Sequence, residues 1–296
     1  MPHILTLVAA PGALDASLVT RVRGALDALG AAPGTPDWLA EREAVDLPFT
    51  GAAEQATAAA RAALADASVD AIATPADGRR KKLLIADMDS TIVTTETLDE
   101  IAAFAGLKEK IAEITKRSMN GELDFRQALI ARVGMLEGLS VTALEATWAE
   151  TRMMPGAAEL VATMRANGAV CCLASGGFTF FTGRVAEKLG FHHHVSNTLL
   201  LADGKLTGGV AEPVFDRNAK LATLTRLATE NALPLEATLA VGDGANDLDM
   251  IGAAGLGVAF KAKPVVAAAA RARVDHGDLT ALLFAQGYRR REFVAG

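Results

Sequence analysis

Most of the chain alternates between short apolar runs and stretches in which apolar residues recur every three or four positions. The runs are typical of buried strands and the recurring pattern of amphipathic helices. From residue 157 onward, expected strands and helices follow one another. The strands are expected at 169–174, 198–202, 205–210, 238–241 and 256–260, the last completing the sheet. Such alternation favours an α/β fold of the doubly wound type, a parallel sheet with helices on both faces.

The first 78 residues read as a separate small module. Strands are expected at 4–9, 38–47 and 69–74, with helices at 14–29 and 52–67. This β-α-β-α-β order predicts a small α+β, ferredoxin-like sandwich in which one strand is not evident. The turn residues Pro75 to Gly78 mark a boundary. We therefore expect domains at 1–78 and 79–296.

A helical insertion is expected inside the second domain. The apolar run Leu83 to Ala86 predicts its first strand. Residues 97–153 then show helical periodicity interrupted by glycines, and no strand pattern. Helices inserted after the first strand would lie over its carboxyl end, so we expect a cap that closes over a site.

Composition narrows the classes of function. The chain has 296 residues and a formal net charge of −6, which does not suggest a nucleic-acid-binding surface. The basic run 79–82 is interpreted as a solvated linker. No uninterrupted apolar stretch is long enough to span a membrane, and residues 1–3 do not begin a signal peptide. The only cysteines, Cys171 and Cys172, lie in an apolar run and are expected to be buried thiols of a cytoplasmic protein.

Two carboxylates follow the first strand of the second domain. Asp87 and Asp89 are spaced i, i+2 directly after Ala86. In open α/β sheets, ligands bind beyond the carboxyl ends of the strands. Close carboxylates repel one another unless a cation or proton lies between them, and one can then act as nucleophile while the other carries a proton. Taken alone, the pair favours the simpler interpretation of an acidic loop at the end of a strand.

Other polar groups are expected at the same edge of the sheet. Ser175 follows the second strand, Asp243 and Asp247 follow a later one, and Lys220 lies in the first turn of a helix. Carboxylates from two strands suit a hard cation such as Mg²⁺. A hydroxyl, a glycine-rich turn and a lysine suit phosphate oxygens. The combination predicts phosphoryl transfer.

These motifs resemble those of the haloacid dehalogenase superfamily. The ordered signatures are Asp87-Met88-Asp89-Ser90-Thr91, Ser175, Lys220 and Gly242-Asp243-Gly244-Ala245-Asn246-Asp247. The stretch Asp87 to Ala102, the segment Met119 to Phe125, and Ser175 to Phe178 resemble more narrowly the phosphoserine phosphatase family within it. That resemblance implies Mg²⁺-dependent hydrolysis of O-phosphoserine to serine and phosphate, the last step of serine biosynthesis.

The resemblance also implies roles for individual residues. Asp87 would be the nucleophile and Asp89 the general acid and base. The metal would be held by Asp87, the Asp89 carbonyl and Asp243, with support from Asp247. The groups expected around the phosphoryl group are Ser175, Gly176, Lys220 and Asn246.

Two charged residues would recognise the amino-acid half of such a substrate. Glu96 offers an anion for the ammonium group, and Arg132 a planar fork for the carboxylate. Met119 and Phe125 would be apolar walls of the site, although each equally fits an ordinary core position. Asp99 and Glu100, near Glu96, are interpreted as surface acids.

Several alternatives remain open. Residues 192–194, three consecutive histidines, are interpreted as a loop because no ligand partner stands at zinc spacing. The N-terminal module resembles regulatory, amino-acid-binding (ACT-like) domains by element order, which leaves room for an effector, and a dimer interface or a remnant are its alternatives. A homodimer is compatible with the sequence. The rival functions are another phosphomonoesterase or phosphotransferase of the superfamily, and a regulatory protein with an inactive catalytic domain.

Overall fold

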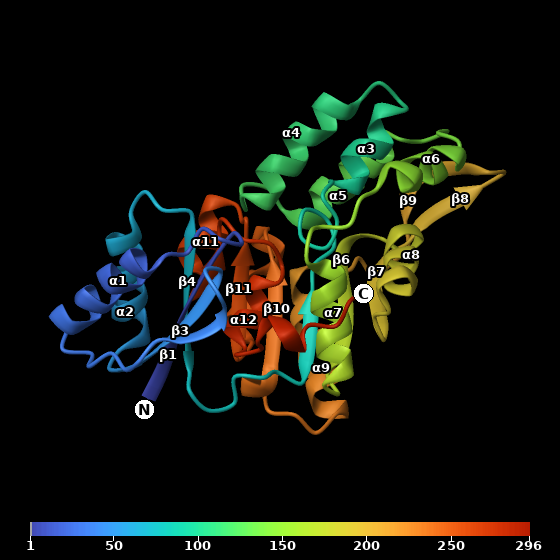
Figure 1. Cartoon of the computed structure of the whole chain (residues 1–296). Helices are drawn as coiled ribbons and strands as arrows, with labels where there is room; N and C mark the ends of the chain where they lie inside the picture. The colour runs from blue at the N-terminus through green and yellow to red at the C-terminus, as the bar shows by residue number, and fades with distance from the viewer. Residues whose placement is uncertain (1) are drawn as a thin grey trace.

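The computed structural model describes residues 2–296, which form two sheets, a separate hairpin and the helices that cover them (Figure 1). The N-terminal module is an antiparallel sheet of order β2-β3-β1-β4 with two helices. Its elements are β1 (Pro2–Ala9), α1 (Ala16–Ala28), β2 (Asp37–Ala40), β3 (Ala44–Thr50), α2 (Ala53–Leu64) and β4 (Val69–Pro75).

One expected strand of this module is in fact two. The single strand expected at 38–47 is wrong: β2 and β3 pair in antiparallel fashion across a turn at residues 41–43. Arg42 has a φ of 54° there, a conformation typical of a tight turn. The polar run Glu41 to Glu43 breaks the apolar pattern, so it was the signal for this turn. The observed order is β-α-β-β-α-β. The domain boundary at residue 78 stays a prediction.

The second sheet is parallel, as the sequence predicts. Its order within residues 2–296 is β12-β11-β10-β5-β6-β7, and every neighbouring pair is parallel. The strands are β5 (Leu83–Ala86), β6 (Val170–Phe178), β7 (His193–Asn197), β10 (Thr238–Gly242), β11 (Leu256–Phe260) and β12 (Ala272–Val274). The chain is therefore an α/β protein.

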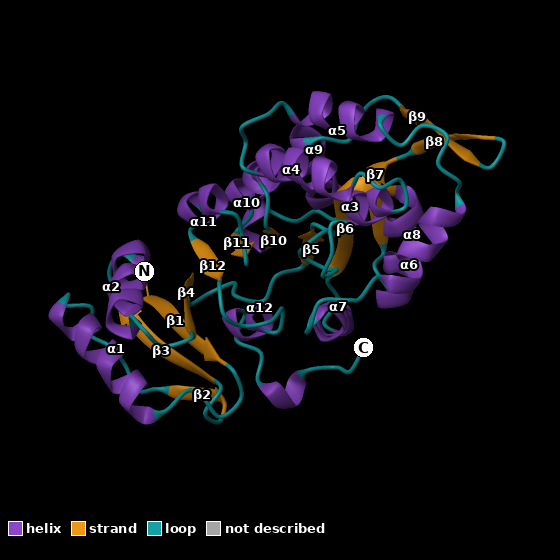
Figure 2. Ribbon diagram, turned by 90° about the horizontal axis from the view of Figure 1, so that it is seen from above, coloured by secondary structure: helices purple, strands orange, loops and turns teal. Residues whose placement is uncertain are grey.

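Alternating side chains of β5 build a core on each face of this sheet. Leu84 and Ala86 join the core that includes α7 and α12, whereas Leu83 and Ile85 join the core that includes α9 and α10. Figure 2 shows these helix pairs on opposite sides of the strands. The helices around the sheet are α7 (Ala157–Ala166), α8 (Thr179–Leu189), α9 (Arg217–Glu230), α10 (Leu248–Ala253), α11 (Pro264–Ala269) and α12 (Ala281–Ala285). Short 3-10 helices occur at Leu235–Ala237, Ala245–Asp247 and Arg290–Glu292.

Two edge strands depart from the expectations. The histidine run is not a loop, because His193 and His194 lie in β7 at one edge of the sheet. At the other edge, β12 follows β11, so residues 256–260 do not complete the sheet. Edge strands carry polar residues or are very short, and neither feature gives a strong apolar signal.

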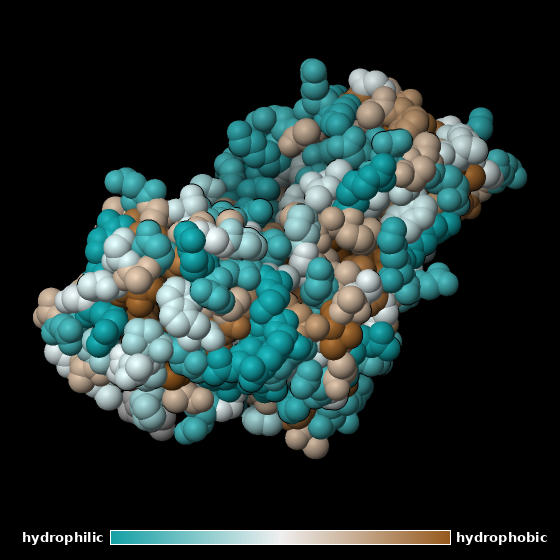
Figure 3. Space-filling model, in the orientation of Figure 1, coloured by the Kyte–Doolittle hydropathy of each residue, from teal (hydrophilic) through white to brown (hydrophobic). Residues whose placement is uncertain are grey.

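Helices lie above the carboxyl ends of the strands, as expected for residues 97–153 (Figure 1). They are α3 (Thr97–Ala103), α4 (Lys108–Met119), α5 (Phe125–Gly134) and α6 (Thr142–Glu150). The hairpin of β8 (Leu199–Ala202) and β9 (Lys205–Val210) packs against α5. We call α3–α6 the cap. On the face drawn in Figure 3, the lobe that carries the cap projects from the body, and hydrophilic and hydrophobic residues are interspersed over both.

The basic run before β5 is a solvated linker only in part: Arg80 and Lys82 are exposed, but Arg79 and Lys81 are not. Arg79 bridges to Asp46 of the N-terminal module at 2.5 Å, and its side chain is 13% exposed. Lys81 is buried. Asp70 of β4 accepts hydrogen bonds from the backbone N–H groups of residues 275–277, beyond β12. These contacts join the two modules. Among the helices of residues 2–296, none is long and apolar enough to cross a membrane.

Candidate active site

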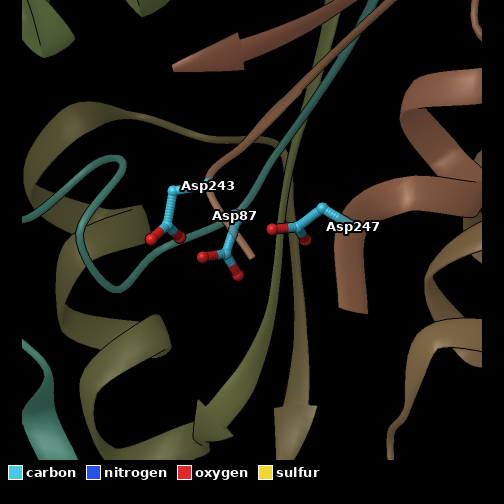
Figure 4. A group of neighbouring side chains, drawn as sticks. All are labelled: Asp87, Asp243 and Asp247. Carbon is cyan, nitrogen blue, oxygen red and sulfur yellow. The ribbon is translucent and has the colours of Figure 1, made fainter. Parts of the chain in front are cut away.

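An acidic cluster lies at the carboxyl edge of the parallel sheet. Asp87 directly follows β5, Asp243 follows β10, and Asp247 closes the turn after it. One carboxylate oxygen from each lies within 4.8 Å of the others, and all three residues are buried. In Figure 4, Asp87 lies between the other two, with the Asp247 carboxylate pointing toward it. The structure thus brings together residues that are 160 positions apart in the chain.

Lys220 partly neutralises this cluster. Its ammonium group donates to Asp87 Oδ1 at 2.5 Å and to Asp247 Oδ1 at 2.6 Å, and the residue is fully buried. Burial lowers the pKa of Lys220, but the carboxylates of Asp247 and Asp87 more than offset this and raise that pKa overall. Lys220 therefore carries its charge. Burial raises the pKa of Asp87, and Lys220 opposes the shift.

The turn after β10 needs its glycine for a steric reason. A Cβ atom at Gly242 would lie 2.3 Å from the Asp247 carboxyl carbon, so any other residue would displace that side chain. Asp247 Oδ2 in turn accepts the N–H of Gly244 at 3.0 Å. The turn therefore holds Asp247 against both the backbone and Lys220.

Asp89 has a different hydrogen-bond partner from Asp87. Its Oδ2 accepts a hydrogen bond from the hydroxyl of Thr97 at 3.1 Å, and its buried Oδ1 has no partner among the residues that the structure describes. Burial, followed by the nearby charge of Glu96, raises the pKa of Asp89 well above its ordinary value. A buried carboxyl group with a raised pKa can hold a proton near neutral pH, as a general acid must.

The glycine-rich end of β6 lies beside Asp89, since a Cβ atom at Gly177 would come within 3.1 Å of Asp89 Oδ2. Ser175, at 1% exposure, accepts the N–H of Gly177 at 2.9 Å. A Cβ atom at Gly176 would come within 2.7 Å of the Phe125 ring, so the cap approaches this end of β6 as closely as glycine permits. Asn246 is buried, and from Pro2 to Gly296 no group forms a hydrogen bond with its Oδ1.

Glu96 and Arg132 reach the same cleft from the cap. Glu96 Oε1 accepts a hydrogen bond from the Ser90 hydroxyl at 2.7 Å. Arg132 is 3% exposed and donates from Nε to the Ala128 carbonyl. The cleft measures about 30 Å³, which is room for about two waters. It is lined by Asp87, Asp89, Glu96, Leu98, Met119, Phe125, Leu129, Arg132, Ser175, Gly176, Gly177, Phe178, Asp243 and Asn246. Every residue that the sequence suggested for the site thus lines the cleft, apart from Lys220 and Asp247. Those two do not line it, but Lys220 contacts Asp87, which does.

One interpretation of the sequence is wrong. Asp99 is not a surface acid: it is 7% exposed and accepts a hydrogen bond from the Thr115 hydroxyl at 2.6 Å. Burial raises the pKa of Asp99 to about 6, although Thr115 and Arg132 oppose the shift. Asp99 lies on the same side of α3 as core residues, but its partner Thr115 belongs to another helix. No local pattern identifies such a pairing.

Sequence reasoning missed two further residues of the site. Thr97 contacts Asp89, as described above. Lys263, which follows β11, donates to Asp243 Oδ2 at 3.1 Å. Its position just beyond the end of a strand in the parallel sheet is a signal that could have found it. Burial raises the pKa of Asp243 to about 7, and Lys263 opposes this shift.

The acidic cluster has the donor chemistry of a site for a hard divalent cation. Buried carboxylate oxygens from two strands lie close enough to share one ion, and Mg²⁺ prefers such ligands. Asp87 and Asp243 line the cleft, and Lys220 and Lys263 each engage only one of their carboxylate oxygens. Both oxygens of Asp247 are engaged, one by Lys220 and the other by the Gly244 N–H. The first pair is therefore available as direct ligands.

Comparison with known proteins agrees with this architecture. The family model of haloacid dehalogenase-like hydrolases matches residues 84–252. A phosphoserine phosphatase of Streptomyces coelicolor is 42% identical over 237 residues, which cover 80% of this chain and 58% of that protein. A phosphoserine phosphatase of Methanocaldococcus jannaschii is 40% identical over 205 residues, covering 69% of this chain and 97% of that protein. The chain thus spans little more than half of the first relative and nearly all of the second.

A solved structure extends the similarity to the N-terminal module. A HAD-family hydrolase from Salmonella enterica serovar Typhi is 28% identical, covers 96% of this chain and 97% of its own, and superposes with a TM-score of 0.83. A capped parallel α/β sheet with an acidic cluster at its carboxyl edge defines the class. The chain belongs to the haloacid dehalogenase-like hydrolase family.

Proposed function

We propose that this protein is a Mg²⁺-dependent phosphoserine phosphatase that hydrolyses O-phosphoserine to serine and inorganic phosphate. The observation that carries the proposal is the meeting of two sets of groups in one cleft. Asp87 and Asp89 come from the sheet, and Glu96 and Arg132 come from the cap. The first pair suits the phosphoryl group, and the second suits the ammonium and carboxylate of an amino acid. The relatives named phosphoserine phosphatase support the same assignment.

In the proposed reaction, Asp87 attacks phosphorus and forms an aspartyl phosphate while the bond to the serine oxygen breaks. Asp89 gives its proton to that oxygen as it leaves. Asp89 then accepts a proton from water, which attacks the same phosphorus and releases phosphate and Asp87. The proton and the carboxylate are thus both restored at the end of the cycle.

The surrounding groups would hold charge and exclude water. Ser175, the Gly176 N–H and Asn246 would hold the phosphoryl oxygens, and Lys220 would offset the negative charge behind Asp87. Met119 and Phe125 would close the cleft on its apolar side. Because a cleft of about 30 Å³ is too small for phosphoserine, we infer that the cap opens for entry and closes again for reaction.

Mg²⁺ would be held by the Asp87 and Asp243 carboxylates and the Asp89 carbonyl, with Asp247 supporting the shell. When bound, it would neutralise charge on the phosphoryl oxygens.

The test is phosphate release from O-phosphoserine, O-phosphothreonine, a sugar phosphate and an aryl phosphate, each with Mg²⁺ and with excess chelator. We expect metal-dependent turnover with phosphoserine strongly preferred. In Arg132→Ala, kcat/KM for phosphoserine should fall by at least about 30-fold, since truncating one partner of a buried charged pair costs about 2–5 kcal/mol. The value for the aryl phosphate should barely change.

Two results would redirect the assignment. Equal preference among the esters, or an equal loss on both substrates in Arg132→Ala, would favour another phosphomonoesterase of the family. Absence of any metal-dependent turnover would favour a regulatory protein with an inactive catalytic domain.

We propose further that residues 1–78 form a ferredoxin-like domain of the ACT type, distinct from the catalytic domain at 79–296. Its β-α-β-β-α-β order and antiparallel sheet support this. In such a role it would bind an amino-acid effector or join two chains as a homodimer. Sedimentation of the full chain across a range of concentrations, with and without serine, tests both roles.

A further inference from the structure

A second cleft lies between the N-terminal module and the parallel sheet, away from the acidic cluster. It measures about 330 Å³. One wall is the first turn of α2 and the end of β4, and the other is the start of β11 and β12, beside which β4 packs (Figure 2). The lining residues are His3, Ala52, Ala53, Glu54, Thr57, Ala73, Thr74, Pro75, Lys81, Gly255, Leu256, Gly257, Arg271 and Ala272. Residues 255–257 lie at the amino end of β11, so this cleft opens at the opposite edge of the sheet from the active site.

Two cations that line this cleft, Lys81 and Arg271, form no salt bridge with any carboxylate of residues 2–296. Lys81 is 5% exposed and donates to the carbonyls of Gly78 at 2.9 Å and Glu236 at 2.8 Å. Arg271 donates to the Ala254 carbonyl at 3.2 Å. Burial lowers the pKa of Lys81 even though the nearby charge of Glu236 opposes the shift, so the buried ammonium group is only partly compensated. One of its three donors remains available. A small anion in the cleft would complete that compensation.

Neutral donors face the same space. Ala52 occupies the N-cap position of α2 and offers no side-chain acceptor to the N–H groups of the first turn. These groups and the helix dipole favour an anion. Independently, Thr74 lines the cleft at 2% exposure, and its buried hydroxyl has no hydrogen-bond partner within residues 2–296. A buried hydroxyl that lacks a partner is uncommon, and a ligand oxygen would satisfy it.

We propose that this cleft is a binding site for a small oxyanion, held by Lys81, Arg271, the first turn of α2 and the Thr74 hydroxyl. Phosphate and carboxylate groups share the required chemistry. Glu54 is the one acidic residue among those that line the cleft, and its carboxylate disfavours a polyanion. The anion would contact both modules at once, so binding would stabilise their docking by mass action.

The test is isothermal titration of the full chain with inorganic phosphate and, in a separate arm, with serine as a small carboxylate. Phosphate can also occupy the active site, so we expect two classes of phosphate site in the wild type. Arg271→Ala should weaken only the second class, by about tenfold or more, since it removes a charged hydrogen bond. Thr74→Val, which is close in volume, should weaken the same class. Lys81→Met should abolish it where that variant folds.

The matched control is Lys82→Met. Lys82 is the neighbouring lysine, is exposed, and donates to the Asn167 carbonyl away from the cleft. This variant should retain both classes of site.

Saturation of the second class by serine as well would identify the carboxylate as a ligand, and saturation by phosphate alone would identify phosphate. If the wild type binds both anions in one class only, or if Arg271→Ala and Thr74→Val bind as the wild type does, the proposal is overturned. This readout does not depend on phosphoserine hydrolysis.

Discussion

The Arg132 guanidinium donates a hydrogen bond from one terminal nitrogen to the Thr115 hydroxyl at 2.8 Å. Thr115 in turn donates to Asp99 Oδ1 at 2.6 Å. The chain of contacts runs from α5 through α4 to α3 and is buried throughout. Because the Arg132 Nε is also bonded to its own helix, this relay fixes which edge of the guanidinium faces the cleft. Thr115 is therefore a positioning residue for Arg132.

Thr115→Val should lower kcat/KM for phosphoserine by about tenfold, the usual effect of losing a hydrogen bond to a charged group. Valine keeps the volume and branching of threonine but cannot accept from Arg132. Thr115→Ser retains the hydroxyl and should restore most of the value. The comparison is steady-state kinetics with phosphoserine and an aryl phosphate. Equal losses on both substrates would instead indicate a general defect of the cap.

The buried Asp99 should make stability depend on pH. Burial raises its pKa to about 6 in the folded chain, from about 3.9 when unfolded. The folded state therefore binds the proton more tightly, and this stabilisation is present below about pH 4 and is lost as the pH rises through about 6. Relative to Asp99→Asn, the wild-type free energy of unfolding should fall by up to about 2 kcal/mol between pH 4 and 7. Urea unfolding at several pH values measures this difference. Glu100→Gln, at the half-buried neighbouring acid, serves as the control, and parallel wild-type and Asp99→Asn curves would contradict the assignment.

The sequence predicted the site better than it predicted the helices around it. Asp87, Ser175 and Asp243 follow apolar runs, and a parallel sheet places the ends of its strands at one edge. Their meeting could therefore be inferred without knowing how any helix packs. Asp99 is different: its burial depends on how α3 packs against α4, where Thr115 lies 16 positions away. Pairing between helices leaves no trace in local periodicity.

Strand signals failed where strands are short or polar. β12 has three residues, and β7 begins with two histidines, so neither gives an apolar run. The basic run 79–82 was partly misread for a related reason. Charge alone suggested solvent, but Arg79 and Lys81 are held at the junction of the modules by Asp46 and by backbone carbonyls. Those partners come from distant parts of the chain.

Asp89 should be the proton carrier of the proposed reaction, because burial and the charge of Glu96 raise its pKa. Asp89→Asn should lower turnover of phosphoserine on the order of 10²–10⁴-fold, the usual share of general acid–base catalysis. An activated aryl phosphate needs less protonation of its leaving group, so its phosphorylation step should lose less. Single-turnover phosphorylation with both substrates measures the difference. Identical losses would remove Asp89 from the role of general acid.

Removal of the Lys220 charge should show how far that charge stabilises the fold against repulsion among the carboxylates of the acidic cluster. The ammonium group of Lys220 donates to both Asp87 and Asp247, and all three residues are buried. Truncating one partner of a buried ion pair costs about 3–5 kcal/mol. Lys220→Met should therefore lower the free energy of unfolding by about that amount in the presence of chelator. Two changes should recover part of the loss. Asp247→Asn in the same chain removes one of the repelling carboxylates, and Mg²⁺ supplies a cation at the same cluster. Urea unfolding of the single and double variants, with chelator and with Mg²⁺, measures the loss in the free energy of unfolding and each of the two recoveries. If the double variant is as unstable as Lys220→Met under both conditions, the loss comes from packing around the lysine chain and not from its charge.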